Sequence, residues 1–526
     1  MADTPSHVSK NPRHFLMSNI LVGLGTLLSR ITGFGKILAL AYAIGLSGLS
    51  DVYNTANTTP NIIYELMLGG ILSATLLPSF VRAFKDNDNQ AISAIISVVI
   101  VLLAGLTILM VVCAPLIMSL YSVTRQDSPQ EFYEVGVILI RLFMPQIFFY
   151  GLIAIGTALL NAQHKFSLPA YAPVLNNLIV IAILMALPSL FGQDINLQNA
   201  AENQQLVLFL GIGTTAGIVL SSLILIPSLM KSGIQFTFLP RWRHPAVQTV
   251  LKMSGWTLGY VICNQIALLI ITLAALHEEG WLTAYQMAFV FFLLPHGLLA
   301  MTITTTFMPK IAHFAAINDW NGYVDKMMLG IKLLILLILP ASVGYILIER
   351  PLLTTLLEHG QFTTKDASLT GDVLAMFAIG LLPFSLYLFL MRGFYALSDA
   401  KTPFKINLLE NIINIILAIP FAMLWGVKGL ALAFALAYCF SVFVAVKALN
   451  HKIAGRLCFD EGFINYFAKI LLSVSTMALI VSSSLYLLST APDWVQTLIS
   501  VIAGGGVYAV MVLRMKLVDI HSLRKA

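Results

Sequence analysis

Long apolar stretches separated by short polar connectors fill almost the whole chain. A helix needs about 20 apolar residues to cross the hydrocarbon of a membrane. Fourteen such stretches are predicted, at 15–46, 52–83, 91–121, 133–161, 168–191, 206–230, 247–275, 281–313, 326–348, 370–396, 404–424, 427–448, 465–489 and 494–515. The pattern therefore predicts an all-α polytopic membrane protein with about 14 transmembrane helices.

The composition excludes a soluble protein of this size. The chain is 58% apolar and 10% charged, with a mean hydropathy of +0.88, whereas soluble domains carry about 25% charged residues. The net charge of +6 fits basic cytoplasmic loops rather than nucleic acid. The four cysteines form no CxxC pair, so we expect small core residues rather than a disulfide framework.

Basic residues gather in alternate connectors. One set carries Arg82, Lys85, Lys165, Lys231, Arg241, Arg243, Lys401 and Lys405, among others. The opposite set carries only Arg125, Arg350, Lys365 and Lys428. Because lysine and arginine are enriched on the cytoplasmic side, both termini are predicted in the cytoplasm, as an even number of spans requires.

Two short motifs recur at nearly the same offset, which suggests an internal repeat. Pro60-Asn61 returns as Pro295-His296-Gly297 after 235 residues, and Lys165 returns as Lys401 after 236. The alternative is coincidence, since proline and lysine often flank helices. The repeat predicts two six-helix lobes related by an axis along the membrane normal, plus two C-terminal helices. The predicted domains are 1–232, 233–450 and 451–526, the last with a cytoplasmic tail.

The first predicted span holds two basic residues within apolar sequence. A charge in hydrocarbon costs roughly 3 kcal/mol or more and usually lines a polar pathway. Lys36 follows Arg30 by six residues, about 9 Å along a helix. Together they would suit a phosphate-bearing ligand; the alternative is that long basic side chains snorkel to the interface.

The span is also long. As a straight helix it would measure about 48 Å against about 30 Å of hydrocarbon, so it must tilt or bend. Gly33 and Gly35 are the predicted hinge.

The second predicted span carries further candidates. Asp51 is either a ligand in the pathway or the N-cap of this helix. Glu65 needs a partner when buried, and Lys36 is the predicted one. Pro60 frees backbone groups and is a third predicted hinge residue.

The eleventh predicted span has polar residues on neighbouring turns. They are Asn407, Glu410, Asn411 and Asn414. Carboxylate and amide oxygens suit Na⁺, and Glu410 alone would suit a proton. The alternative is interhelical hydrogen bonding by the amides. No spacing typical of a metal or catalytic site occurs, so no metal, cofactor or enzymatic activity is predicted.

Several motifs along the chain resemble one family. They are Ser29-Arg30-x-x-Gly33-Phe34, Asp51, Pro60-Asn61, Ser73 with Leu77-Pro78, Leu160-Asn161, Phe166, Pro169-Ala170, Ala172-Pro173, Gly360-x-Phe362-Thr363-x-x-Asp366-Ala367 and Phe394-Tyr395-x-x-x-Asp399-x-Lys401-Thr402-Pro403. In this order they are similar to the MurJ/MviN lipid II flippases of the MOP exporter superfamily. The resemblance implies fourteen helices in two lobes, with the last two helices bordering a groove for the lipid tail.

The resemblance also implies a function. It is the transfer of lipid II, an undecaprenyl-diphosphate-linked peptidoglycan precursor, across the bacterial cytoplasmic (inner) membrane by alternating access. The implied partners are lipid II, membrane lipids and cell-wall synthesis proteins, with a coupling Na⁺ or H⁺ or the membrane potential as energy source. Arg30, Lys36, Asp51, Asn61 and Ser73 match functional positions of the family, and Glu65 is added as a cavity residue.

The chain also departs from the family pattern. Ile37 replaces an Asp, Tyr64-Glu65 replaces a basic pair, and Phe289-Val290 replaces Asp-Arg. Ile271 stands where some relatives have a sodium ligand. Tyr64-Glu65-Leu66, Gly69-Gly70 and Leu294-Pro295-His296-Gly297 look closer to the actinobacterial branch, without the cytoplasmic kinase-like domain of that branch.

Three other functions compete. A flippase for another lipid-linked oligosaccharide is difficult to separate by sequence. A drug exporter of the MATE type would favour an acidic, apolar cavity. A membrane glycosyltransferase would need acidic groups in a large outer loop, and the 349–369 connector with Glu358 and Asp366 is short.

Overall fold

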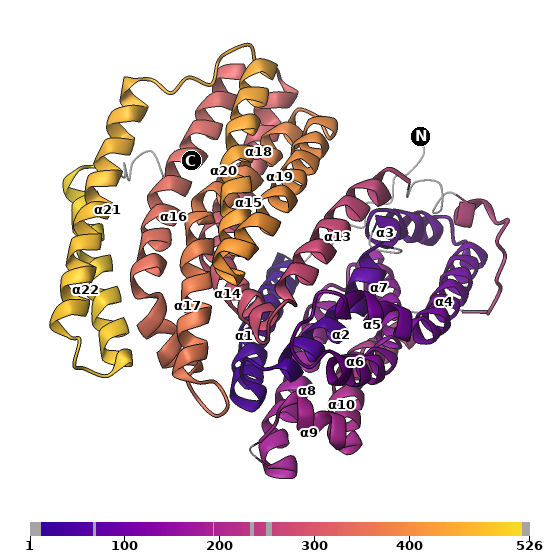
Figure 1. The fold of residues 1–526 in the computed structure, drawn as a ribbon. Coiled ribbons are helices and arrows are strands. Elements are labelled where there is room, and N and C mark those ends of the chain that lie inside the picture. The colour runs from indigo at the N-terminus through magenta and orange to yellow at the C-terminus, as the bar shows by residue number, and fades with distance from the viewer. Residues whose placement is uncertain (1–11, 67–69, 193, 232–235, 249–254, 518–526) are drawn as a thin grey trace, which may run out of the picture. The chain divides into compact units, whose positions relative to one another are not determined.

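The chain folds into helices throughout the part that can be described. The computed structural model describes residues 12–66, 70–192, 194–231, 236–248 and 255–517 (Figure 1). At 12–19, 70–75 and 255–260 it describes the backbone alone. Every regular element within these ranges is a helix, which confirms the all-α prediction.

Eleven of the described helical stretches are long and apolar enough to cross a membrane. They are Ile20–Ile44, Asn89–Val112, Pro129–Ala162, Ser167–Phe191, Gln204–Met230, Trp281–Ala316, Trp320–Leu357, Lys401–Trp425, Val427–Lys452, Glu461–Leu487 and Asp493–Arg514. A twelfth consists of α17 (Thr364–Ile379) and α18 (Leu381–Ala396), which are bent by 44° at Gly380. The tenth predicted span is therefore a broken helix.

The second and seventh predicted spans take other forms. The second comprises α2 (Gly48–Tyr64) and α3 (Gly70–Lys85), on either side of residues 67–69, which lie outside the described part. The seventh corresponds to α13 (Gly255–Ala275), whose apolar described part is Val261–Ala275. With these two, about 14 membrane helices account for the chain.

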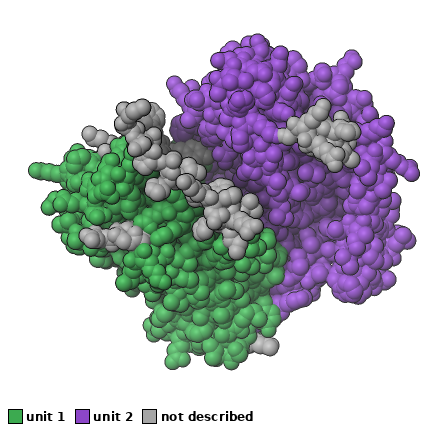
Figure 2. All heavy atoms as spheres, turned by 180° about the vertical axis from the view of Figure 1, so that it is seen from behind, with its two compact units in different colours: residues 1–265 green, residues 266–526 purple. Residues whose placement is uncertain are grey.

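The chain divides into two compact units, residues 1–265 and 266–526 (Figure 2). The division falls within α13, whereas the predicted first boundary lies in the preceding connector. Helices α21 (Glu461–Leu487) and α22 (Asp493–Arg514) pack on α16 (Trp320–Leu357) and so belong with the second unit. The finer division into lobes and a C-terminal pair stays a prediction.

The first unit is built around contacts between helices distant in sequence. α1 (Pro12–Ile44) packs along α8, and α2 packs on α6 and α7. The other helices have these bounds: α4 Asn89–Val112, α5 Ala114–Ser122, α6 Pro129–Phe143, α7 Gln146–Ala162, α8 Ser167–Phe191, α9 Leu197–Glu202, α10 Gln204–Leu223 and α11 Ile226–Met230.

The second unit pairs neighbouring helices. α16 packs on α17, and α19 packs on α20. The remaining bounds are α14 Trp281–Pro295, η2 His296–Ala300, α15 Met301–Ala316, α19 Lys401–Trp425 and α20 Val427–Lys452. A Cβ on Gly380 would lie 2.7 Å from the Ala435 Cα of α20, so the bend between α17 and α18 brings their backbone directly onto α20.

Large apolar side chains are exposed along the helices, as a membrane protein requires. Met423 is 84% exposed and Leu479 69%. In lipid, hydrocarbon covers such faces, while the polar groups are kept inside. The buried polar set includes Asp51, Arg125, Asn177 and Glu410.

Candidate functional site

The two basic residues of α1 lie on one continuous helix. Arg30 is exposed and Lys36 is partly buried. Six residues at 3.6 per turn leave them about 120° apart around the axis. The structure therefore brings them close along the helix but does not place them on one face.

The side chain of Asn177, in α8, is hydrogen-bonded to α1 next to Arg30. The Asn177 amide nitrogen donates to the Ser29 carbonyl at 3.2 Å and to the Thr32 hydroxyl at 3.1 Å. A Cβ on Gly33 would lie 3.5 Å from the same nitrogen. Asn177 thus fixes the turn of α1 that carries Arg30.

The predicted hinge at Gly33 and Gly35 is helical in this structure. α1 runs through both residues without a break. A Cβ on Gly35 would touch Ile181 of α8 at 3.4 Å, so both glycines lie against α8. Their hinge role stays a prediction.

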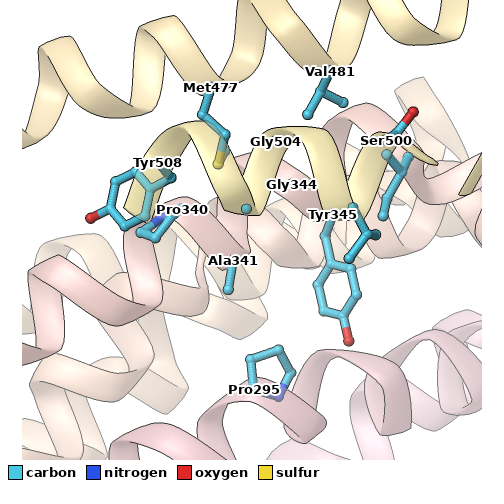
Figure 3. Close-up of a pocket in the computed structure, with 13 residues that line it drawn as sticks. Pro295, Pro340, Ala341, Gly344, Tyr345, Met477, Val481, Ser500, Gly504 and Tyr508 are labelled. Carbon is cyan, nitrogen blue, oxygen red and sulfur yellow. The ribbon is translucent and has the colours of Figure 1, made fainter. Parts of the chain in front are cut away.

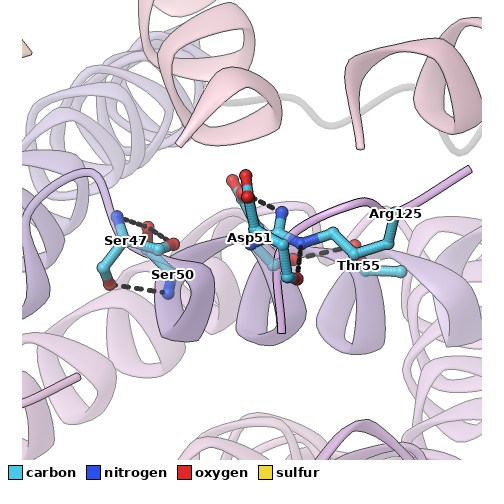
Figure 4. Close-up of polar contacts among 6 residues, drawn as sticks. Ser47, Ser50, Asp51, Thr55 and Arg125 are labelled. Atoms are coloured by element: carbon cyan, nitrogen blue, oxygen red, sulfur yellow. Dashed lines mark hydrogen bonds and ion pairs between the residues drawn. The ribbon is translucent and has the colours of Figure 1, made fainter. Parts of the chain in front are cut away.

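Asp51 forms a buried ion pair that the sequence did not indicate (Figure 4). Its Oδ2 atom lies 3.0 Å from Nη1 of Arg125, and both side chains are fully buried. The Arg125 Nε donates to the Asp127 carbonyl at 2.9 Å, and the guanidinium carbon lies 4.9 Å from the Phe132 ring centroid. The pair joins the start of α2 to the connector between α5 and α6.

Asp51 is not the N-cap of α2. Ser47 takes that place, with Ser50 completing a reciprocal capping box at 3.3 and 3.0 Å (Figure 4). Asp51 lies in the first helical turn, where a carboxylate suits the positive end of the helix dipole. Its charge is therefore stabilised by the helix end and by Arg125.

The other cavity candidates of the second span lie near the end of α2. Pro60 is buried within α2, and Asn61 is exposed. Glu65 is partly buried. Among the residues described, no ion pair joins Lys36 to Glu65, so the predicted contact between them is wrong for this structure. The side chain of Ser73 lies outside the described residues.

The polar cluster of α19 is buried in the second unit. Glu410 is 3% exposed, and Asn407, Asn411 and Asn414 are buried with it. The Asn411 amide donates to the Asn407 carbonyl at 3.0 Å and to its Oδ1 at 3.3 Å. Oδ1 of Asn414 has no hydrogen-bond partner among the described residues. Oxygen atoms thus lie close together here. Among the described residues, no three or more His, Cys, Asp or Glu side chains form a group that could hold a metal ion.

An apolar pocket of about 310 Å³ opens between α16, α21 and α22 (Figure 3). Its lining includes Pro295, Tyr345, Ser500, Gly504 and Tyr508. The Tyr345 hydroxyl donates to the Phe291 carbonyl at 2.9 Å, and the Tyr508 hydroxyl to the Leu336 carbonyl at 2.6 Å. Because both hydroxyls are bonded to backbone, the pocket presents a mainly hydrocarbon surface.

The fold is that of a polytopic, all-α membrane protein. A solved structure described as "Lipid II flippase MurJ, inward closed conformation" matches with a TM-score of 0.77 and 24% identity, over 95% of this chain and 100% of that one. A multidrug resistance MATE family transporter of the MOP superfamily matches with a TM-score of 0.65 and 13% identity, over 83% and 98%. These likenesses show the fold.

Sequence comparison then gives the family. The model of the family "Lipid II flippase MurJ" matches residues 40–502. The probable lipid II flippase MurJ of Haemophilus influenzae is 28% identical over 86% of this chain and 89% of that protein. The lipid II flippase MurJ of Burkholderia cenocepacia is 27% identical over 85% of each. The chain belongs to the MurJ family, which confirms the family prediction; the likeness to the actinobacterial branch stays a prediction.

Sequence reasoning missed Arg125 and Asn177 as partners of the candidate site. Arg125 was noted only as a basic residue of a connector, 74 positions from Asp51. Asn177 is 148 positions from Ser29. No spacing rule links residues so far apart, because the contact depends on how helices pack.

Proposed function

We propose that the protein moves lipid II from the cytoplasmic to the outer leaflet of the bacterial cytoplasmic membrane. The observation that carries this proposal is the match of the flippase family model over residues 40–502. The diphosphate and sugars of such a lipid cannot cross about 30 Å of hydrocarbon unaided. A transporter with alternating access would shelter the headgroup and leave the polyprenyl tail in lipid.

Arg30 and Lys36 are the proposed ligands of the diphosphate. A guanidinium matches phosphate geometry with two parallel donors, and an ammonium adds a compact charge. Asn61, Glu65 and Ser73 are proposed to contact the sugars or peptide of the headgroup. Asp51 is proposed to act through Arg125, because its carboxylate is buried against that residue.

The apolar pocket suits part of the polyprenyl tail. Its bonded tyrosine hydroxyls and glycines leave room for a hydrocarbon chain beside α22.

Both termini are proposed to be cytoplasmic. Thr237 and Leu239, of the connector after α11, bond to Ser93 and Ser97 in the first turns of α4. This contact supports placing two of the predicted cytoplasmic connectors on one side.

Glu410, Asn411 and Asn414 are proposed as a site for a coupling Na⁺ or proton. Glu410 has no ion pair among the described residues. A buried carboxyl of this kind is costly when charged, so it favours a cation or a proton as partner. The membrane potential is the alternative source of energy, since moving one charge is worth about 2.3 kcal/mol per 100 mV.

A flippase for another lipid-linked oligosaccharide is the second candidate, and the MATE-like fold keeps small-molecule export as a third. Genetic complementation distinguishes these three candidate functions. The gene should rescue a strain depleted of its lipid II flippase and prevent lipid II from accumulating inside the cells. The Arg30→Ala and Lys36→Ala variants should fail to do so. Persistent accumulation with the well-expressed wild-type protein would favour another cargo, and full rescue by both variants would reject the anion site.

A further inference from the structure

The connector after α11 contains a non-helical strip, residues 236–243, whose first part lies along α4 (Figure 1). The strip turns at its end, where the His244 N–H donates to the Arg241 carbonyl at 3.1 Å. The Thr237 N–H donates to the Ser93 hydroxyl at 3.2 Å. The Leu239 N–H donates to the Ser97 hydroxyl at 2.8 Å. Both serines are buried, at 1% and 0% exposed.

The spacing of these bonds fixes the strip in register. Serines four apart on a helix are about 6 Å apart along its axis, and amides two apart on an extended chain are separated by nearly the same distance. The Ser97 hydroxyl in turn donates to the Ser93 carbonyl at 2.7 Å. The strip is therefore held in a fixed position in the first unit, with one face against α4 and the other facing outward.

That face is aromatic. Phe236 is 45% exposed, Phe238 is 58% exposed and Trp242 is 44% exposed. Tryptophan is enriched where a membrane helix meets the headgroup region, because its ring is apolar but carries a polar N–H. Phenylalanine supplies the apolar face of segments that lie in the interface. The strip bonds to the first turns of α4, near the end of a membrane-spanning helix, which is where such rings are expected.

The strip is also basic. Arg241 and Arg243 flank Trp242 and are exposed, and neither joins an ion pair within the described part of the chain. From Asn203 to His277 the sequence contains no Asp or Glu. The strip itself is therefore positive. The segment before α4, next to which the strip lies, adds Arg82 and Lys85 as well as Asp86 and Asp88.

We propose that residues 236–243 bind anionic phospholipid headgroups at the membrane surface. The rings of Phe236, Phe238 and Trp242 enter the boundary between headgroups and acyl chains, and the two arginines contact lipid phosphates. A basic residue near an anionic surface strengthens attachment about fivefold, so two should favour anionic over zwitterionic lipid by about 30-fold. Ser93 and Ser97 hold the backbone at Thr237 and Leu239, next to Phe236 and Phe238.

Quenching of Trp242 fluorescence tests the proposal in the full chain. The protein is placed in nanodiscs of phosphatidylcholine containing a small fraction of brominated phosphatidylglycerol or brominated phosphatidylcholine. The chain has six tryptophans, so the Trp242 signal is taken as the difference between wild type and Trp242→Phe. This signal should be quenched at an approximately 30-fold lower fraction of brominated phosphatidylglycerol than of brominated phosphatidylcholine.

Substitution then identifies the charges. The Arg241→Gln/Arg243→Gln variant should lose the preference, whereas the control Arg514→Gln/Lys516→Gln, which alters an exposed basic pair elsewhere, should keep it. Equal quenching by both lipids in the wild type, or none by either, would overturn the proposal. So would a preference that survives in the Arg241/Arg243 variant. Even if the variant does not fold, the comparison of the two brominated lipids with the wild-type protein tests the proposal.

Discussion

The carboxylate of Asp51 and the guanidinium of Arg125 meet at 3.0 Å with both side chains fully buried. Removing one partner of such a pair leaves an unpaired buried charge, which typically costs 3–5 kcal/mol. The sequence leaves two roles open for Asp51, a ligand of the transported headgroup or the N-cap of α2. In this structure its nearest charged partner is instead a residue of the same unit.

Substituting Arg125 should therefore reproduce the loss caused by substituting Asp51. Arg125→Met and Asp51→Asn should each lower stability by about 3–5 kcal/mol. The double variant should cost clearly less than the sum, because neither charge is then left unpaired. Thermal unfolding in detergent measures this. Strictly additive losses would contradict the pairing, and normal stability with lost transport in Asp51→Asn alone would restore a direct ligand role.

Asn177 should affect headgroup binding more than stability. Hydrogen bonds between membrane helices are worth about 0.6 kcal/mol on average, so Asn177→Ala should barely shift the melting temperature. Because Asn177 holds the carbonyl next to Arg30, the lipid concentration for half-maximal translocation should rise several-fold. Asn176→Ala is the matched control, since the Asn176 Oδ1 has no described hydrogen-bond partner. Equal effects of the two variants would remove Asn177 from the site.

Glu410 should be required for a Na⁺ or H⁺ gradient to drive translocation. Glu410→Gln removes the charge of a carboxyl that is 3% exposed, so stability should be unchanged or higher. Translocation driven by a Na⁺ or H⁺ gradient should fall to the rate measured without a gradient. Glu349→Gln, in α16 of the same unit, serves as the control. A full response to the gradient in Glu410→Gln would exclude the site.

The connector between α18 and α19 should show a pH-dependent stability. Burial alone would raise the pKa of Asp399, but hydrogen bonds from Lys452 and Thr402 outweigh it and hold that pKa below its usual range. Its Oδ1 also accepts from the Lys401 and Thr402 amides at 3.0 and 3.1 Å. A lowered folded-state pKa gives stability that is present above the unfolded value, about 3.9, and lost as the pH falls further.

Asp399→Asn should therefore cost about 2 kcal/mol at pH 7. The difference from wild type should shrink as the pH drops below about 4. Melting curves at a series of pH values test this. Lys428→Met provides the control: its ion pair with Asp372 is exposed, with 42% and 45% of the side chains accessible, and should contribute less than about 1 kcal/mol. A pH-independent difference for Asp399→Asn would contradict the assignment.

The membrane-spanning helices could be predicted from the sequence because the hydrocarbon of a membrane requires long apolar stretches. Stretches of about 20 apolar residues are required by physics, and eleven appear directly as spanning helices. The break at Gly380 was not predicted, since Leu381–Ala396 continues the apolar run. At the bend, the backbone lies close to Ala435 in another helix, a contact that a local apolar pattern does not reveal.

The candidate site was less predictable. The sequence singles out Asp51 as a candidate, and the structure buries its side chain. The choice of its partner depends on how α2 meets the connector after α5, which no local pattern encodes. The expected pairing of Lys36 with Glu65 failed for the same reason.

The most direct test is translocation of lipid II by the purified protein in vesicles. Fluorescent lipid II in the inner or outer leaflet is followed with and without a Na⁺ gradient or a membrane potential. The wild-type protein should move lipid II between leaflets, and Arg30→Ala and Lys36→Ala should reduce the rate at least tenfold, which corresponds to about 1.4 kcal/mol of lost stabilisation. No translocation above that of protein-free vesicles, under any of these gradients, would contradict the proposed function.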